Sequence, residues 1–233
     1  MKILVFTPTW EISSGQRAMR PECENTLWMQ RCDGAIEHVI GLHNPYPIGD
    51  HRNVLAQYQA AQREFLSGDW DALLTFEHDH LLPDTDAVQR LVDTAGDVVY
   101  APYLLRTSRT LSTWQYLPGG KLGESLSGYP VELAQARADR IWRVSGVGFG
   151  CTLIKRQVLY MIPFRATGER DPLPDQAFAR DCARLGFVSL ARMDVPVFHW
   201  DGERWLDPFA PSAAELAAFE RMAPLDWRRD AGG

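Results

Sequence analysis

The sequence predicts an α/β fold, a single Rossmann-type domain with a mainly parallel central sheet flanked by helices. Short apolar runs at residues 3–6, 36–42, 73–76 and 97–101 have the length and composition of buried strands. The segments between these runs carry helical periodicity and helix-start signals. Strands that alternate with helices connect by right-handed crossovers, so this order favours a parallel sheet. The 233 residues are enough to bury the core of one such domain.

Each strand of the first half is followed by a turn or by a helix start. The first strand ends at Thr7-Pro8-Thr9, and a helix with proline at its first position is expected over residues 21–31. The next helix begins after Asp50, which is placed to act as its N-cap. Behind the third strand, another proline-led helix is expected over residues 83–94.

The second half is less regular. Residues 102–140 are rich in Ser, Thr and Gly with scattered aromatic side chains, so we expect a long irregular insertion that acts as a functional loop. The clearest helix of the chain spans residues 174–185, because its apolar residues recur at i, i+4 and i+7 and a glycine follows. The remaining elements are expected as strands at 141–144, 146–154, 187–190 and 195–198 and as an amphipathic helix at 211–222.

The composition limits the kinds of partner. The net charge of −6 and the absence of a Lys/Arg block argue against the clustered basic surface that nucleic-acid binding needs. The four cysteines fall at no zinc-like or CxxC spacing, so we expect reduced, mostly buried thiols. No apolar run reaches transmembrane length, and the first one is shorter than the core of a leader peptide. We therefore expect a cytoplasmic protein with no nucleic-acid partner and no transmembrane segment.

The most informative segment is the turn Glu77-His78-Asp79, directly behind the third predicted strand. In an open α/β sheet, ligands bind at the edge formed by the carboxyl ends of the strands. Two carboxylates one residue apart on such a turn can both supply oxygen ligands to a magnesium or manganese ion. The structural alternative is that these acids only cap the helix that follows.

Two more residues have matching chemistry but lie far along the chain. Asp175 opens the helix at 174–185, and His199 follows the strand-like run at 195–198. A carboxylate at a helix start can simply favour the helix dipole, and a lone histidine is more often structural than a ligand. The order in which these residues occur gives them more weight than each has alone.

That order resembles the GT-A glycosyltransferases, especially the family 2-like bacterial transferases that use nucleotide-diphosphate sugars. The resemblance covers roughly residues 2 to 200. It consists of an opening strand with a Pro-Thr turn, an Arg-Asn pair at a helix start, an acidic motif in the place of DxD, a glycine-rich strand, a helix beginning Asp-x-x-Phe, and a late histidine. These motifs are residues 3–9, 51–53, 74–79, 146–156, 174–187 and 197–199.

The resemblance implies a role for each motif. Asp79, His199 and Glu77 would hold a manganese or magnesium ion, and Asp175 would be the catalytic base. Glu77 stands where the family has aspartate, and Pro174 stands where it has an acid. The nucleotide would lie against Thr7, Pro8, Thr9, Arg52, Glu77 and His78. The donor sugar and the acceptor would be bordered by Gly148, Phe149 and Trp114.

We therefore expect a metal-dependent glycosyltransferase of the hexosyltransferase type that moves a sugar from a nucleotide-diphosphate donor to a hydroxyl-bearing acceptor. Family 2-like members mostly invert the anomeric configuration, and the chain lacks the Gln-x-x-Arg-Trp segment of processive synthases, so single inverting additions are expected. The domain is expected to span 1–210, with a nucleotide-binding part at about 1–101 and an acceptor-side part at about 102–210, before a helical tail at 211–233.

Two alternatives remain open on the sequence. The chain could be a non-catalytic nucleotide-sugar-binding module on the same fold. It could also be a metal-dependent hydrolase that uses His78, Asp79 and His80 as ligands. The hydrolase interpretation lacks the preceding His-x-His pair of the metallo-β-lactamase type, because Phe76 and Glu77 stand there instead.

Overall fold

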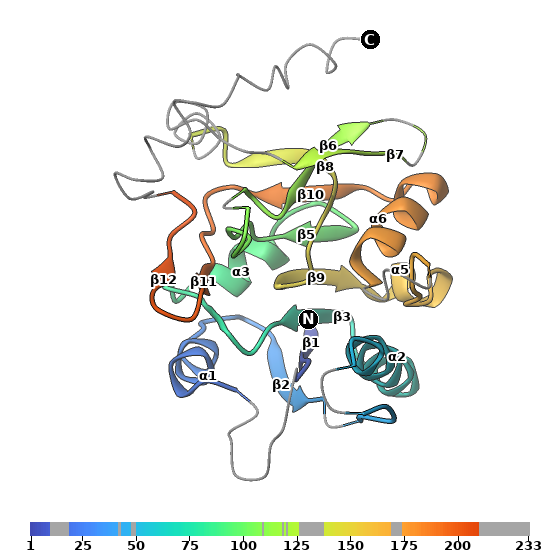
Figure 1. The fold of residues 1–233 in the computed structure, drawn as a ribbon, viewed down its shortest axis with the longest axis horizontal. Helices are drawn as coiled ribbons and strands as arrows, with labels where there is room; N and C mark the ends of the chain where they lie inside the picture. The colour runs from blue at the N-terminus through green and yellow to red at the C-terminus, as the bar shows by residue number, and fades with distance from the viewer. Residues whose placement is uncertain are drawn as a thin grey trace.

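The computed structural model describes residues 1–9, 19–41, 43–47, 50–108, 110–117, 119, 121–125, 138–168 and 174–209. Within these residues, nine strands form a central sheet and three short strands form a second sheet (Figure 1). The strand order is β2-β1-β3-β9-β5-β10-β8-β6-β7 in the central sheet and β12-β11-β4 in the small one. This arrangement confirms the predicted α/β class.

The central sheet consists of β1 (Lys2–Thr7), β2 (Ala35–Ile40), β3 (Ala72–Phe76), β5 (Val98–Tyr100), β6 (Thr113–Leu117), β7 (Lys121–Ser125), β8 (Ile141–Val147), β9 (Cys151–Lys155) and β10 (Ser189–Arg192). The small sheet consists of β4 (His80–Leu81), β11 (Phe198–Trp200) and β12 (Trp205–Leu206). The helices are α1 (Pro21–Trp28), α2 (Arg52–Ser67), α3 (Ala87–Val92), α5 (Arg156–Met161) and α6 (Pro174–Leu185).

Strand direction in the central sheet is mainly parallel. The pairings place β2, β1, β3, β5, β10 and β6 in one direction and β9, β8 and β7 in the other. Because β1 and β3 are parallel neighbours, the loops that follow Thr7 and Phe76 leave the sheet at the same edge.

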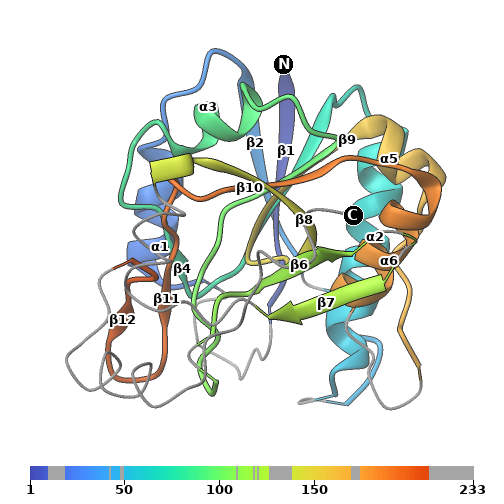
Figure 2. The same ribbon diagram turned by 90° about the horizontal axis from the view of Figure 1, so that it is seen from above.

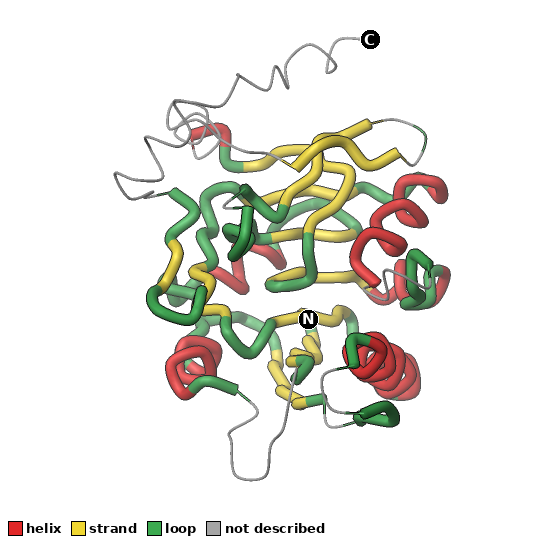
Figure 3. Tube along the Cα trace, viewed as in Figure 1, coloured by secondary structure: helices red, strands yellow, loops and turns green. Residues whose placement is uncertain are grey.

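Both faces of this sheet are buried. Along β1, Ile3 and Val5 belong to one core cluster and Leu4 and Phe6 to the other, as the alternation of side chains along a strand requires. Helices α1 and α3 cover the first face, and α2, α5 and α6 cover the second (Figures 2 and 3). Strands buried on both faces have no polar side to show, which explains their continuous apolar runs.

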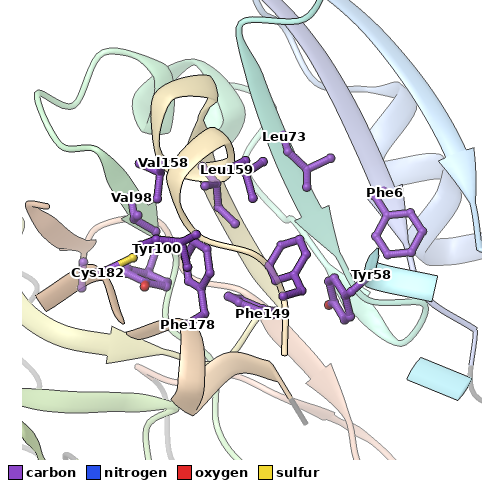
Figure 4. Packing of buried hydrophobic residues seen from close by; sticks show 14 of the residues in the cluster. Phe6, Tyr58, Leu73, Val98, Tyr100, Phe149, Val158, Leu159, Phe178 and Cys182 are labelled. Atoms are coloured by element: carbon purple, nitrogen blue, oxygen red, sulfur yellow. The ribbon is translucent and has the colours of Figure 1, made fainter. Parts of the chain in front are cut away.

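The core beneath α2 and α6 is rich in aromatic side chains (Figure 4). Phe149 contacts Tyr58, Phe164 and Phe178 at ring-centroid distances of 5.3, 5.4 and 5.3 Å. Offset and edge contacts of this kind add about 0.5–1.5 kcal/mol to the free energy gained by burying each ring. This aromatic cluster fixes α6 against the sheet and thereby places the first turn of α6.

Arg156 connects β9 with the C-terminal end of α2. Its guanidinium donates hydrogen bonds to the carbonyls of Phe65, Leu66, Gly68 and Trp70 at 2.9–3.3 Å. The last carbonyls of a helix have no partner inside the helix and carry the negative end of its dipole, so a cation there stabilises the helix end.

The structure corrects several expected boundaries. The prediction of an irregular insertion over residues 102–140 is wrong for part of its length. Strands β6 and β7 pair antiparallel there and extend the sheet beyond β8. Strand β6 lies between β8 and β7, and β7 is the edge strand, whose outer side tolerates polar residues that hide the strand pattern. The helix expected over 83–94 is reduced to α3, and His80–Leu81, to which the sequence assigned no element, is strand β4. The predicted helix at 211–222 lies outside the described residues.

Two features of the composition are visible in the fold. Cys23, Cys151 and Cys182 are buried as expected, and Cys32 is partly buried; all four are free thiols. Burial raises the pKa of the Cys23 and Cys151 thiols to about 12, so both carry their protons at neutral pH. Among the described residues, no helix has the length and apolar character needed to cross a membrane.

Replacing Phe178 by alanine is expected to lower the free energy of unfolding by about 3–5 kcal/mol, because the ring is completely buried in the aromatic cluster. Equilibrium urea denaturation measures this change. Leu185→Ala in the same helix is the control, because Leu185 is 48% exposed and its truncation should change stability by no more than about 0.5 kcal/mol. Equal effects of the two substitutions would contradict the packing described for α6.

Candidate active site

The loops behind β1 and β3 meet at the carboxyl edge of the sheet. The backbone carbonyl of Pro8 accepts a hydrogen bond from the His78 side chain, and the carbonyl of His78 accepts one from the backbone N–H of Arg20 at 3.2 Å. The two predicted motifs, Thr7-Pro8-Thr9 and Glu77-His78-Asp79, are therefore in direct contact.

The threonines of the first loop are occupied by structural hydrogen bonds. Thr9 donates its backbone N–H to the side-chain oxygen of Gln57 at 2.7 Å and its hydroxyl to the carbonyl of Gly41 at 2.6 Å. A hydrogen bond of 2.9 Å joins the hydroxyl of Thr7 to His38. Both threonines are buried, so their side chains hold the loop in place.

Arg52 lies at the start of α2, as predicted, and is 57% exposed. Its guanidinium pairs with Asp50 at 2.6 Å and lies over the ring of Tyr46, 4.2 Å from the ring centroid. Asp50 is held in turn by the backbone N–H of Arg52, and these contacts lower the pKa of Asp50 to about 2. The predicted nucleotide-side arginine is thus pre-positioned by a neighbouring acid.

Asp79, His80 and His199 form the cluster with the chemistry of a cation site. One ligand atom from each, a carboxylate oxygen or an imidazole nitrogen, lies within 4.8 Å of the others. All three residues are buried. The pairing of β4 with β11 places His80 directly opposite His199, and their rings stack with centroids 4.4 Å apart at an angle of 17°.

Hydrogen bonds orient the members of this cluster. The Nδ1 of His199 donates to the carbonyl of Leu104 at 2.6 Å, so its Nε2 presents a lone pair toward Asp79 Oδ2, 3.7 Å away. The Nδ1 of His80 is 2.9 Å from Asp79 Oδ1, while its Nε2 is buried and has no hydrogen-bond partner among the residues that the structure describes. A carbonyl behind one imidazole nitrogen is the usual way to fix the tautomer of a metal-binding histidine.

His78 and His80 are held neutral. Burial, followed by the nearby histidines His199 and His78, lowers the pKa of His80 well below its ordinary value. Burial, with a smaller contribution from Arg106, lowers the pKa of His78 to about 4. Neutral imidazole is the form that binds a metal ion, so the donor set fits a divalent cation.

Glu77 lies beside this cluster and faces a second acid. Its carboxylate oxygen is 3.6 Å from His80 Nδ1, and its side chain retains 31% of its exposure. Burial first, then the negative charge of Asp175, raises the pKa of Glu77 to about 7, against the opposing effect of Arg106. The acidic turn behind β3 and the first turn of α6 therefore share one electrostatic environment.

Asp175 lies in the first turn of α6, where it was predicted. Its Oδ1 accepts the backbone N–H of Gln176 at 2.8 Å, and its Oδ2 is directed toward Gly148: a Cβ on this glycine would lie 3.7 Å from it. The same Cβ would come within 2.2 Å of the hydroxyl of Tyr103. Gly148 has no room for a side chain and brings its backbone close to Asp175.

The other predicted sugar-side residues have different surroundings. Phe149 is 3% exposed in the aromatic core, so its side chain supports the edge from below. Its carbonyl accepts the hydroxyl hydrogen of Thr75 at 2.6 Å. Trp114 lies in β6, partly exposed, beside Gly146 and away from the core cluster.

Two residues at this site were not predicted as part of it: His80, which belongs to the cluster, and Arg106, which contacts the cluster. His80 entered the sequence analysis only in the hydrolase alternative, and its position next to Asp79 was the available signal. Arg106 forms an ion pair with Asp79 and donates its Nε–H to His199 Nε2 at 3.0 Å. Nothing in the local sequence of Arg106 indicates this role, because the contact spans 93 residues.

Comparisons with known proteins establish the fold. No protein-family model matches the chain, and no curated protein matches it either. Among solved structures, A197 from STIV matches with a TM-score of 0.60 and 22% identity over 89% of this chain and 91% of that chain. At this level of identity the match shows the fold alone.

Other matching structures superpose more loosely. The mannosyltransferase PcManGT from Pyrobaculum calidifontis, in complex with GDP-Man and Mn2+, has a TM-score of 0.46 and 13% identity over 80% of this chain and 53% of that chain. The nucleoside-diphosphate-sugar pyrophosphorylase from Vibrio cholerae RC9 has a TM-score of 0.43 and 10% identity over 95% of this chain and 100% of that chain.

Replacing Asp79 by alanine is expected to abolish Mn2+ binding, because it removes the carboxylate of the three-residue cluster. His199→Ala should weaken binding less, since a neutral nitrogen contributes less to a hard cation than a carboxylate does. Calorimetric titration with Mn2+ measures both. The matched control is Asp181→Ala, whose carboxylate is similarly buried, 8% exposed against 5%, but pairs with Arg165. Unchanged Mn2+ affinity in Asp79→Ala would rule out the cluster as a metal site.

Proposed function

We propose that the protein is a metal-dependent glycosyltransferase that moves a sugar from a nucleotide-diphosphate donor to a hydroxyl acceptor, by single additions with inversion. The observation that carries the proposal is the convergence of the Asp79, His80 and His199 cluster with the acids Glu77 and Asp175 at one edge of the sheet. This edge is where open α/β sheets bind nucleotides and related ligands.

Asp79 and His199 are the residues that would hold the cation, with His80 orienting the Asp79 carboxylate through Nδ1. A divalent cation at this position would supply Lewis-acid stabilisation of the negative charge that develops on the diphosphate leaving group. The imidazole of His199 favours manganese over magnesium, because magnesium prefers a shell made of oxygen ligands. Glu77 lies close enough to the cluster to bind the cation or the ribose.

Asp175 would act as the catalytic base. As the acceptor hydroxyl attacks the anomeric carbon, its proton passes to the Asp175 carboxylate and its oxygen forms the new glycosidic bond. The bond from the anomeric carbon to the diphosphate oxygen breaks, and its electron pair leaves with the nucleoside diphosphate. Glu77, the neighbouring acid, has a pKa raised to about 7 and can stay protonated beside a charged Asp175.

Binding of the nucleotide falls to the loops at the ends of β1 and β3 and to Arg52. The hydroxyls of Thr7 and Thr9 already have protein partners, so we assign these residues a backbone role at the nucleotide. Arg52 is 57% exposed, so its guanidinium can leave the ion pair with Asp50 and bind a phosphate or the ribose side of the ligand instead. Trp114 and the Gly148 backbone are assigned to the sugar and acceptor side.

One observation favours a second candidate. A carboxylate with two histidines is also a donor set used by metal-dependent hydrolases, and Glu77 beside it could activate a water molecule. The two proposals differ in the acceptor, which is a substrate hydroxyl for the transferase and water for the hydrolase. A non-catalytic module would bind the nucleotide sugar without turning it over.

Thermal-shift screening of nucleoside diphosphates and nucleotide sugars, with and without Mn2+, tests the proposed ligand class. A ligand at about 100 times its dissociation constant should stabilise the fold by roughly 2.7 kcal/mol. We expect stabilisation that requires Mn2+ and that discriminates among the bases. Stabilisation by none of these ligands would overturn the proposed function.

Asp175→Asn should keep the fold and the nucleotide affinity but lower sugar transfer by roughly 10²- to 10⁴-fold, because the amide cannot accept the proton. Single-turnover transfer from the donor found in the screen measures the change. The matched control is Asp86→Asn at the start of α3, an exposed carboxylate paired with Arg90, which should transfer at the wild-type rate. Near-normal transfer by Asp175→Asn would reduce Asp175 to a helix-terminal charge worth about 0.3–1 kcal/mol of stability.

A further inference from the structure

Arg106 occupies the position between Asp79 and His199. Its terminal nitrogen forms an ion pair with Asp79 Oδ2, and its Nε–H donates to His199 Nε2 at 3.0 Å. The same two acceptor atoms face each other across 3.7 Å and belong to the cluster with cation-site chemistry. One guanidinium thus contacts the two groups that a divalent cation would need.

The guanidinium satisfies a strong requirement of this cluster. The Asp79 side chain is 5% exposed, and a buried carboxylate is costly unless a cation or several hydrogen bonds compensate its charge. Nδ1 of His199 is committed to the carbonyl of Leu104, so Nε2 is the nitrogen that Arg106 and a metal ion would share. The lone pair on His199 Nε2 cannot accept the Arg106 hydrogen bond and coordinate a metal ion at the same time.

Arg106 can leave without disturbing the core. Its side chain is 47% exposed, in contrast to those of Asp79 and His199, which are 5% and 8% exposed. It belongs to a turn that follows the bridge residue Leu104. The backbone N–H of Leu105 donates to the carbonyl of Thr110 at 2.9 Å, which closes this turn independently of the arginine side chain.

We propose that Arg106 is an exchangeable internal cation, which neutralises the cluster in the resting protein and must be displaced from Asp79 and His199 when a divalent metal ion binds. This inference rests on the metal site of the proposed function and adds a competitor to it. The affinity for metal is then the intrinsic affinity reduced by the fraction of molecules in which Arg106 has left the site. The displaced guanidinium places a positive charge next to the metal-binding edge.

Titration of the full chain with Mn2+ alone, followed by the electron paramagnetic resonance signal of the free ion, tests the competition. Arg106→Gln should bind Mn2+ roughly 10- to 100-fold more tightly than the wild type, the factor expected if the open arrangement has a population of about 1–10%. Without metal, Arg106→Gln should melt at a lower temperature than the wild type, because Asp79 loses its partner, and Mn2+ should restore more of its stability.

The matched control is Arg165→Gln. Arg165 is 49% exposed and pairs with the buried Asp181 at 2.8 Å, so its removal takes an arginine from a buried carboxylate that is not part of the cluster. Asp181 keeps a second ion pair, with Arg184 at 3.1 Å. Its Mn2+ affinity should equal that of the wild type. A gain in Arg165→Gln as large as in Arg106→Gln would overturn the proposal, because it would reflect net charge alone.

A measurement on the unmodified protein covers the case in which Arg106→Gln does not fold. In nitrogen-15 spectra without metal, the Nε–H of Arg106 should be protected from solvent exchange by its bond to His199. Saturation with Zn2+, which is diamagnetic and is bound by imidazole nitrogen and carboxylate oxygen, should shift this resonance and remove the protection. Protection that persists at saturating Zn2+ would overturn the proposal.

The outcomes separate this inference from the proposed function. Equal or weaker Mn2+ binding by Arg106→Gln, while the wild type binds, overturns the exchange and leaves the metal site in place. Absence of Mn2+ binding in both proteins overturns the metal site together with the exchange. If Arg106→Gln binds Mn2+ more tightly than the wild type, and the double variant with Arg106→Gln and Asp79→Ala does not bind it, the results support both the metal site and the exchange.

Discussion

The site depends on the register between two very short strands. The pairing of β4 with β11 places His80 opposite His199, although the two residues are 119 residues apart in the sequence. A shift of one residue in either strand would turn one of the two imidazoles to the other side of the ribbon, because side chains alternate along a strand. The carbonyl of Leu104 and the edge of Tyr103, whose ring centroid lies 4.4 Å from that of His80, hold both rings in this register.

Electrostatics at the sheet edge follow from this placement. Two imidazoles, one buried carboxylate and two neighbouring acids lie together here beside the guanidinium of Arg106. A folded protein can sustain such a group of acids only if a cation compensates it or if protons are retained. Among the described residues, the raised pKa of Glu77 and the ion pair of Arg106 provide compensation of both kinds.

The elements that the sequence predicts best are those with a local signal. Buried strands such as β1 and β3 are predicted by their apolar runs. The acidic turn behind β3 predicts Asp79 as a site residue. The structure also brings His199 to Asp79 and places Asp175 on α6 near Glu77, as the order of the motifs had suggested. The hairpin of β6 and β7 was missed because an edge strand can be polar on its outer positions.

What the sequence could not supply is long-range pairing. Arg106 lies in a stretch without periodicity, and its meeting with His199 depends on how the chain returns from α6 to β11. Likewise, the hydroxyls of Thr7 and Thr9 look available in the sequence, and only the fold reveals His38 and Gly41 as their partners. Phe149 stands in a glycine-rich motif, but the alternation across the sheet directs its ring into the core.

Tyr103 couples the glycine-rich turn to the histidine pair. A Cβ at Gly150 would come within 2.5 Å of both His80 Nε2 and the Tyr103 ring, and a Cβ at Gly148 would meet the Tyr103 hydroxyl. Residues 103, 148 and 150 therefore form one packing unit in which the volume of the tyrosine is matched by two missing side chains. A smaller residue at 103 would open space for alanine at 148, so these two positions can change together more easily than either can change alone. Alanine at 150 would still meet Nε2 of His80, so it would displace the imidazole even beside a smaller residue 103.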